Sequence, residues 1–258
     1  MAALLTCWVN LASGASLGYA TPALPSLQQA NSRLHITESQ GSWVAGLVML
    51  GALAGGVLAG PCISLGRRRA LWLVAPPLTL AWLLIALAPN VWFLYIAHFI
   101  LGMCLGIISD ASQIYVSETA SAQWRGALGC IPVLMFNVGI LTCYTAGAWL
   151  DWQDLAFFGG GLTLPALLFP IAVPETPSYL VAQGHMEEAI AALYWLRGAT
   201  YDITSEYHVR QAVFHNSNII PSHLSRGILF CFFFVLFFCF VLLLRLCVRV
   251  CVWRHLSL

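Results

Sequence analysis

Long apolar runs recur along this sequence, and they set the first limit on what it can fold into. An α-helix needs about 20 apolar residues to cross the hydrocarbon core of a bilayer. The chain is 60% hydrophobic and 8% charged, whereas a soluble domain carries roughly 25% charged residues. These features predict an all-α, multi-pass protein embedded in a lipid bilayer. The net charge of +1 gives no reason to expect a nucleic-acid partner.

Six of these runs are long enough to cross a bilayer. They cover residues 2–24, 43–65, 70–88, 91–116, 127–150 and 155–173. The first run could instead be a signal peptide, but no basic residue precedes it, Asn10 lies inside it, and five more runs follow. We therefore expect six transmembrane helices, of which this run forms the first.

The arginines lie mostly on one side of the predicted spans. If the N-terminus is cytoplasmic, the outer loops contain Arg33, and the cytoplasmic loops contain Arg67, Arg68, Arg69, Arg125, Arg197, Arg210 and Arg226. Cytoplasmic loops of membrane proteins carry an excess of basic residues. This distribution therefore predicts a cytoplasmic N-terminus.

Small and polar residues form stripes at helical spacing on two of the predicted helices. In the second span the stripes are Gly51, Gly55 and Ala59 and, beside them, Ala52, Gly56 and Gly60. Small residues let two helix backbones approach closely in lipid, which predicts a tight bundle. In the fourth span one stripe contains Gly102, Gly106, Asp110, Gln113 and Ser117.

Three polar residues lie at membrane depth. A carboxylate there costs at least ~2.5 kcal/mol on insertion scales, so Asp110 should face protein or a water-filled cavity. It could line that cavity, carry a proton, or be an accident of a degenerate sequence, and the same alternatives hold for His98. Asn137 needs hydrogen-bond partners, either on a neighbouring helix, which is the commoner case, or on a polar ligand.

The sequence offers little for catalysis. Its nine cysteines form no CxxC pair and mostly lie in apolar runs, which favours packing over a disulfide framework or a metal site. The motifs HExxH and GxxxxGK[ST] do not occur. We therefore expect no catalytic residue, no metal site, no cofactor and no enzymatic activity.

Charged residues gather at the cytoplasmic ends of the predicted helices. Residues 60–69 join spans two and three, residues 115–129 join spans four and five, and an acid follows span six. The gate candidates in these segments are Gly60, Gly66, Arg67, Arg68, Glu118, Arg125, Gly126 and Glu175. Opposite charges at the same end of several helices can lock those ends together and release them, as a transporter requires. We expect these charges to approach one another.

An amphipathic segment follows the sixth span. Within residues 174–213, apolar side chains repeat at helical spacing, at Met186, Ile190, Leu193 and Tyr194. This apolar face is too short to span a bilayer, so it predicts a helix on the inner membrane surface or beneath the bundle. A second short helix is predicted to start near Asp202 or Thr204, either of which could cap it.

These segments resemble the motifs of the sugar porter family of the major facilitator superfamily. The Y-x-x-E…R-G motif is present as Tyr115, Glu118, Arg125 and Gly126. The P-E-S/T-P-x-x-L motif spans residues 174–180, and E-E-A-x-x-x-L-x-x-L-R-G spans residues 187–198. With GSWVAGLVMLGALAGG and NVGILTCYTAG, residues 5–213 are most similar to the facilitated trehalose transporters of insects.

The resemblance implies a fold, a location and an activity. Residues 1–173 would form the N-terminal six-helix half of a transporter, built from two inverted repeats of three helices (3+3), and residues 174–213 its cytoplasmic helices. The protein would lie in the plasma membrane and carry trehalose or a glucose-like sugar by facilitative, alternating access. The candidates to face the sugar are Asn10, Gln113 and Asn137.

Several positions depart from the family's pattern. No acid stands between Gly60 and Gly66, and His98 replaces an arginine of the fourth span. Gln113 replaces a proline, and Asp110 occupies a position that is usually apolar. The inner charge network is therefore expected to be altered at two places.

Residues 214–258 differ from the family altogether. Residues 228–244 are unbroken apolar residues, and three arginines follow them, which a seventh span would place outside, against the charge bias. We interpret this tail as an extra hydrophobic helix foreign to the fold, and the family's second half as missing. The chain could be a half-length isoform, a decaying copy or a mis-assembled gene model. We expect residues 1–258 alone not to transport sugar efficiently, although a homodimer could supply a second wall.

Overall fold

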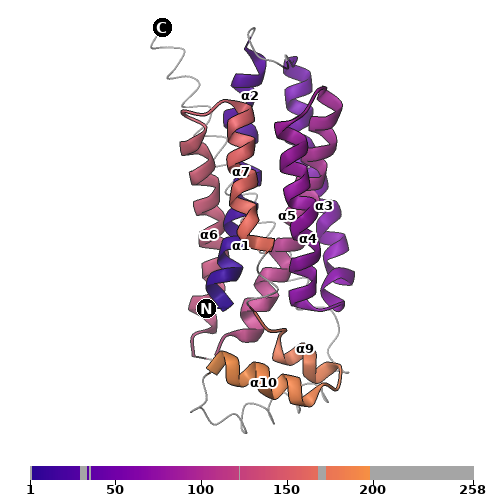
Figure 1. Cartoon of the computed structure of the whole chain (residues 1–258), viewed down its shortest axis with the longest axis vertical. Coiled ribbons are helices and arrows are strands. Elements are labelled where there is room, and N and C mark those ends of the chain that lie inside the picture. The colour runs from indigo at the N-terminus through magenta and orange to yellow at the C-terminus, as the bar shows by residue number, and fades with distance from the viewer. Residues whose placement is uncertain (1, 30–33, 35, 122, 168–172, 198–258) are drawn as a thin grey trace. The chain divides into compact units, whose positions relative to one another are not determined.

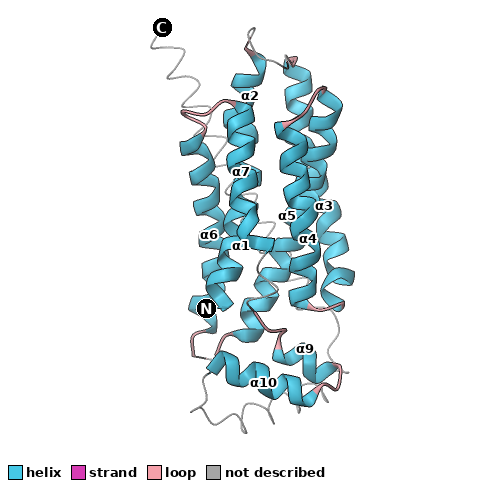
Figure 2. Cartoon of the chain, viewed as in Figure 1, coloured by secondary structure: helices cyan, strands magenta, loops and turns pink. Residues whose placement is uncertain are grey.

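The computed structural model describes residues 2–29, 34, 36–121, 123–167 and 173–197. Every regular element in these residues is an α-helix (Figure 2). The helices are α1 (Ala2–Gly18), α2 (Ala20–Gln28), α3 (Glu38–Ser64), α4 (Arg67–Ala86), α5 (Val91–Thr119), α6 (Arg125–Ala146), α7 (Trp152–Leu167), α9 (Pro177–Ala182) and α10 (Met186–Arg197).

Each of the six predicted spans corresponds to a helix of the structure. By length and composition, α3, α4, α5 and α6 can cross a membrane. The first span is divided into α1 and α2 at Tyr19, whose torsion angles are themselves helical (φ −62°, ψ −44°). The sixth corresponds to α7, and residues 168–172 of this span lie outside the described part. The predicted helix near Asp202 and the tail helix at 228–244 also lie outside the described residues.

The third helix begins earlier than its hydrophobicity predicts. Thr37 caps α3, because its hydroxyl accepts the Gln40 N–H at 3.4 Å, and the Gln40 side chain accepts the Thr37 N–H at 3.0 Å. This reciprocal capping box satisfies two amides that the first helical turn leaves free. The helix therefore starts at Glu38, whereas the apolar run begins at residue 43.

The pairing of the helices follows a two-fold pattern (Figure 1). The helix α3 packs along α5, and α1 packs along α6. The helix α4 contacts α5 and α7, while α1 contacts α7 and α5. If α1 and α2 together count as the first span, then span two pairs with span four, and span five pairs with span one. Spans two and five, and spans one and four, thus hold equivalent places in the two halves. This exchange is what two repeats of three helices produce, and it confirms the 3+3 organisation.

Glycines bring the backbones of the two long pairs into contact. A methyl group at Gly51 or Gly55 of α3 would overlap backbone atoms of α5, and one at Gly102 or Gly106 would overlap backbone atoms of α3. The α1–α6 pair repeats the device, since a methyl group at Gly14 would overlap the carbonyl oxygen of Phe136. Only residues without a side chain allow helices to approach this closely in lipid.

A buried aromatic cluster fills the space between α1, α4, α5 and α7. The rings of Tyr19 and Trp82 meet edge to face with centroids 5.3 Å apart, and the ring of His98 lies 5.7 Å from that of Tyr19. Gly159 of α7 lies against the indole of Trp82, which a methyl group there would overlap. The Tyr19 hydroxyl donates to the carbonyl of Trp152 at 2.9 Å. This cluster packs α1, α4, α5 and α7 against one another near the end of α4 and the start of α7.

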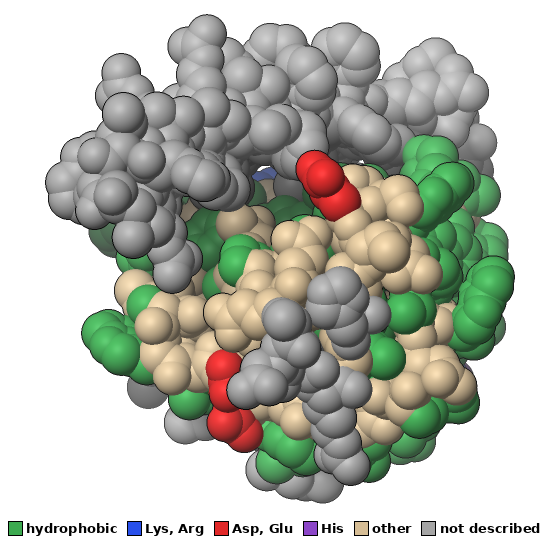
Figure 3. All heavy atoms as spheres, turned by 90° about the horizontal axis from the view of Figure 1, so that it is seen from above, with side chains coloured by type: hydrophobic (Ala, Val, Ile, Leu, Met, Phe, Trp, Pro, Cys, Tyr) green, Lys and Arg blue, Asp and Glu red, His purple; other side chains and the backbone are tan. Residues whose placement is uncertain are grey.

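The two ends of the bundle differ in charge. We call the end where α3 ends, α4 begins and α5 ends the charged end; Arg67, Arg68 and Arg69 lie there, and α9 and α10 lie beyond it. At the opposite end the exposed acids are Glu38, Asp151 and Asp154. Figure 3 views that opposite end: apolar side chains surround it, and acidic side chains are visible at two places.

The glycine contacts lead to a stability prediction. Gly102→Ala should destabilise the bundle by about 1–3 kcal/mol, because the added methyl group must push α3 away from α5. The matched control is Gly46→Ala on the exposed side of α3, where nothing lies within 4 Å of the new methyl group. Thermal unfolding of the purified protein in detergent measures the difference. Equal midpoints for the two variants would contradict the close approach of α3 and α5.

Candidate functional site

A tight turn joins α3 to α4 at the charged end. Leu65 closes α3, and Gly66 follows with a φ of +126°, a conformation that side chains other than glycine rarely adopt. A methyl group on Gly66 would also lie 2.7 Å from Oε2 of Glu175. Glycine is therefore required here twice, by the backbone and by the carboxylate packed against it.

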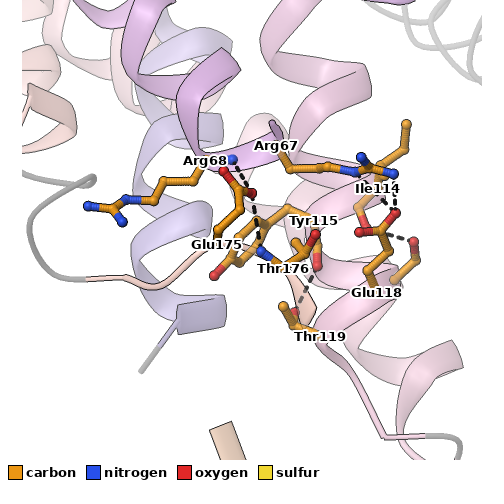
Figure 4. A network of polar contacts seen from close by, with 9 residues as sticks. Arg67, Arg68, Ile114, Tyr115, Glu118, Thr119, Glu175 and Thr176 are labelled. Atoms are coloured by element: carbon orange, nitrogen blue, oxygen red, sulfur yellow. Dashed lines mark hydrogen bonds and ion pairs between the residues drawn. The ribbon is translucent and has the colours of Figure 1, made fainter. Parts of the chain in front are cut away.

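Glu175 caps the helix that this turn begins. Its Oε1 accepts the backbone N–H of Arg68 at 2.9 Å and that of Thr176 at 3.1 Å. Gly66, the residue at the cap position of α4, has no side chain that could do so. A carboxylate at a helix N-terminus is stabilised by the free amides and by the helix dipole. The segment after α7 is thus joined to the start of α4 (Figure 4).

An ion pair joins the same helix end to α5. The Arg67 guanidinium donates to Oε1 of Glu118 from Nη2 at 2.8 Å and from Nε at 3.2 Å. The two side chains keep 22% and 18% of their surface exposed. Figure 4 shows this pair and the Glu175 cap on neighbouring residues at the start of α4. Two successive arginines therefore connect to two different acids, one through the side chain and one through the backbone.

Tyr115 adds a third connection. It lies on α5 one turn before Glu118, and its hydroxyl donates to the carbonyl of Pro174 at 3.0 Å. The Tyr115 side chain is fully buried. The Y-x-x-E spacing therefore places Tyr115 and Glu118 on the same side of α5. Tyr115 bonds the carbonyl of Pro174, and Glu118 bonds the guanidinium of Arg67.

The remaining gate candidates lie apart from this cluster. Arg125, at the start of α6, is exposed, and the described part of the chain shows no ion pair for it. Gly60 and Gly126 are also exposed, with nothing within 4 Å of a methyl group placed on either. The structure thus brings together Gly66, Arg67, Arg68, Glu118 and Glu175, and leaves out Gly60, Arg125 and Gly126. The gating role of all eight stays a prediction.

The three candidate sugar-binding residues lie in different environments. Asn10 is buried, with its Oδ1 accepting from Ser112 of α5 at 3.0 Å and its Nδ2 donating to Thr6 at 2.9 Å. Gln113 is half-buried and donates to the carbonyl of Gly129 at 3.1 Å. Asn10 and Gln113 therefore join α5 to α1 and α6.

Asn137 is the exposed member of the three. Its Nδ2 donates to the Val133 carbonyl on its own helix at 2.7 Å, and the side chain lies on the exposed face of α6. Asn137 is thus more exposed than Asn10 and Gln113. Binding of a ligand by Asn10, Gln113 or Asn137 stays a prediction.

The two ambiguous polar residues of α5 also differ. His98 is completely buried, with Nδ1 within 2.8 Å of the Leu94 carbonyl and its ring on Tyr19, so it is part of the core. Asp110 is half-buried, as expected for a carboxylate that must face protein or a cavity. Among the described residues, no group of three or more His, Cys, Asp and Glu side chains could hold a metal ion.

The cap on α4 leads to a test by hydrogen exchange. Glu175→Gln removes the charge that favours the helix N-terminus, a loss of about 1 kcal/mol, so amide exchange in the first turn of α4 should rise about fivefold. The control is Glu187→Gln, an exposed acid in the first turn of α10 that changes the net charge equally. Unchanged exchange in α4 of the Glu175 variant would remove its carboxylate from the cap.

Comparisons with known proteins agree with this architecture. A family model described as sugar (and other) transporter matches residues 12–244. The xylose–proton symporter XylE, bound to 6-bromo-6-deoxy-D-glucose, has a similar fold, with a TM-score of 0.72 at 22% identity. That match covers 84% of this chain and 53% of XylE.

Curated relatives from insects are more similar in sequence. The facilitated trehalose transporter Tret1 of Drosophila grimshawi is 39% identical over 89% of this chain and 27% of the relative. Tret1 of Polypedilum vanderplanki is 36% identical, with 89% of this chain and 49% of the relative covered. For Tret1 of Bombyx mori the identity is 42%, over 75% of this chain and 38% of the relative. The chain spans less than half the length of these relatives. It belongs to the sugar transporter family of the major facilitator superfamily.

Proposed function

We propose that this chain forms one half of a facilitative sugar transporter and that trehalose, or a related glucoside, is the sugar carried. The observation that supports this most is the set of contacts at the charged end, where Arg67 pairs with Glu118 and Glu175 caps α4. The three insect relatives above are named as facilitated trehalose transporters. No covalent step is needed, because in such transporters one bundle rocks against another around a central site.

The contacts at the charged end supply a gate in this proposal. They join α4 to α5 and to the segment before α9, so this end opens only when they separate. An exposed ion pair is worth about 0–1 kcal/mol, and the Arg67–Glu118 pair is partly shielded. Links of this size can bias the choice between two conformations without locking either of them.

The proposal includes an orientation. The charged end, with its three successive arginines, faces the cytoplasm, and the end with Glu38, Asp151 and Asp154 faces outward. The excess of basic residues on cytoplasmic loops supports this. The membrane is the plasma membrane, where a transporter of an external sugar acts.

Asn137 is the leading sugar-binding candidate of the three. Asn10 is buried and Gln113 is half-buried, whereas the Asn137 side chain is exposed on α6. An exposed amide can be reached by a sugar and can hydrogen-bond its hydroxyl groups. The second wall of the site would come from another bundle.

A pair of transport assays tests the proposal. Labelled trehalose counterflow is measured for purified residues 1–258 in liposomes, and for a chimera in which residues 12–197 replace the matching part of the Bombyx mori relative. We expect saturable, trehalose-competed exchange by the chimera and a rate near that of empty liposomes for residues 1–258, because these supply one wall of the pathway. A chimera that inserts in the membrane and carries no trehalose would contradict the proposed function. Saturable exchange by residues 1–258 would show that they form a complete pathway, as a homodimer could.

The same chimera tests the ion pair. Glu118→Gln removes the charge that pairs with Arg67, so the relative stability of the two conformations shifts and the exchange rate should change several-fold, by about the 0–1 kcal/mol of such a pair. The amount of protein in the membrane should stay the same. Glu188→Gln, on the exposed side of α10, is the matched control. Identical kinetics for both variants would exclude Glu118 from the gate.

A further inference from the structure

Tyr179 of α9 makes two contacts with the turn that begins α4. Its hydroxyl donates to the carbonyl of Leu65 at 3.0 Å. The guanidinium carbon of Arg67 lies 5.3 Å from the centroid of its ring. The hydroxyl of one side chain of α9 thus contacts the residue that caps α3, and its ring contacts the first residue of α4.

These contacts complement the ion pair of Arg67. A guanidinium is planar, so it can donate hydrogen bonds from its edge while its face stacks on an aromatic ring. Nε and Nη2 of Arg67 point to Glu118, and Tyr179 meets the same group. The ring therefore limits the orientations that Arg67 can adopt, and the orientation that remains is the one that meets Glu118.

The bond to Leu65 fixes the ring itself. The last carbonyls of a helix have no partner inside the helix, and Leu65 closes α3. The Tyr179 hydroxyl supplies a donor to one of them. The ring is thereby tied to the turn at 65–66 and stays beside Arg67.

The other side of α9 packs elsewhere. Leu180 and Val181 form a small core with Ala189 and Ala192 of α10, so α9 and α10 make a pair held by their own apolar contacts. Tyr179 connects this pair to the turn between α3 and α4. Movement of the α9–α10 pair away from the bundle would remove the ring from Arg67.

We propose that Tyr179 is a positioning residue of the gate: it orients Arg67 toward Glu118, so that release of α9 and opening of the ion pair occur together. Its consequence for transport rests on the proposed function, but the coupling itself is a property of this chain. Two side chains of the P-E-T-P-S-Y-L motif thus contact the start of α4. Glu175 accepts the backbone N–H of Arg68, and the ring of Tyr179 lies against the guanidinium of Arg67.

Three variants of the whole chain test the coupling by hydrogen exchange in the first turn of α4. Tyr179→Leu removes ring and hydroxyl, and we expect exchange to rise about fivefold. Tyr179→Phe keeps the ring and should give a smaller rise. The control is Tyr194→Leu, which replaces an exposed tyrosine of α10 and should leave exchange in α4 unchanged. It shows whether the loss of any tyrosine near the charged end changes exchange in α4.

A double-variant cycle separates positioning from simple anchoring. If Tyr179 acts through Arg67 and Glu118, its replacement by Leu should have little further effect when Glu118 is already Gln, because contacting residues that act on one group are not additive. Additive effects, or unchanged exchange in Tyr179→Leu, would overturn the proposal. Tyr179→Phe with Glu118→Gln gives the same cycle if the Leu variant fails to fold.

A transport arm keeps the two proposals apart. In the chimera, Tyr179→Leu should change the rate as Glu118→Gln does, and the two together should resemble either one alone. Coupled hydrogen exchange in a chimera that carries no trehalose would support the positioning role and contradict the transport function. If the hydrogen-exchange effects of the two variants are coupled but the transport rate is the same with and without Tyr179→Leu, the role of Tyr179 in the gate is contradicted.

Discussion

The contact of α3 with α5, backbone against backbone, is the constraint on which the charged end depends. Gly51 and Gly55 leave no room for a methyl group against α5, and Gly102 and Gly106 leave none against α3. Two helices in such contact can slide or rotate little without a clash, because packed interiors deform poorly. The end of α3 is therefore fixed beside the end of α5. Since only two residues separate α3 from α4, the first side chain of α4 is brought within reach of Glu118.

Much of this fold could be predicted from the sequence, since apolar length alone locates the spans. Hydrophobicity does not predict where a helix ends if polar contacts determine that end. The capping box of Thr37 and Gln40 extends α3 outward to Glu38, although those residues are polar and resemble a loop. The two small-residue stripes of α3 show the same limit. Both permit close approach, but only the contacts with α5 reveal that Gly51 and Gly55 meet a helix while Gly60 faces open space.

The sequence predicts which residues lie at the charged end, but it does not predict which atoms each of them contacts. Arg67, Glu118 and Glu175 belong to motifs that the sequence displays, yet a motif does not state what a side chain binds. Glu175 contacts a backbone amide, which is present at every residue and leaves no sequence pattern. Arg125 shares a motif with Glu118 but lies on α6, exposed and away from the ion pair. Asn10 is predicted to face a ligand, and the structure adds a bond that its sequence position does not reveal, because Asn10 accepts from Ser112 of a neighbouring helix.

The start of α4 is where weak links acquire a combined effect. Glu175 bonds its backbone, Glu118 bonds the edge of its first side chain, and Tyr179 meets the face of that same side chain. Each link is worth roughly 1 kcal/mol, too little to hold these elements together alone. They come from residues 51, 107 and 112 positions further along the chain than the α4 residues that they contact, so a shift of α5, of the segment before α9 or of α9 itself strains at least one of them. Residues 61–65 carry no acid, so the negative charge that faces Arg67 and the α4 amides comes from those other segments. The contacts at this end thus depend on how the elements meet and not on the turn alone.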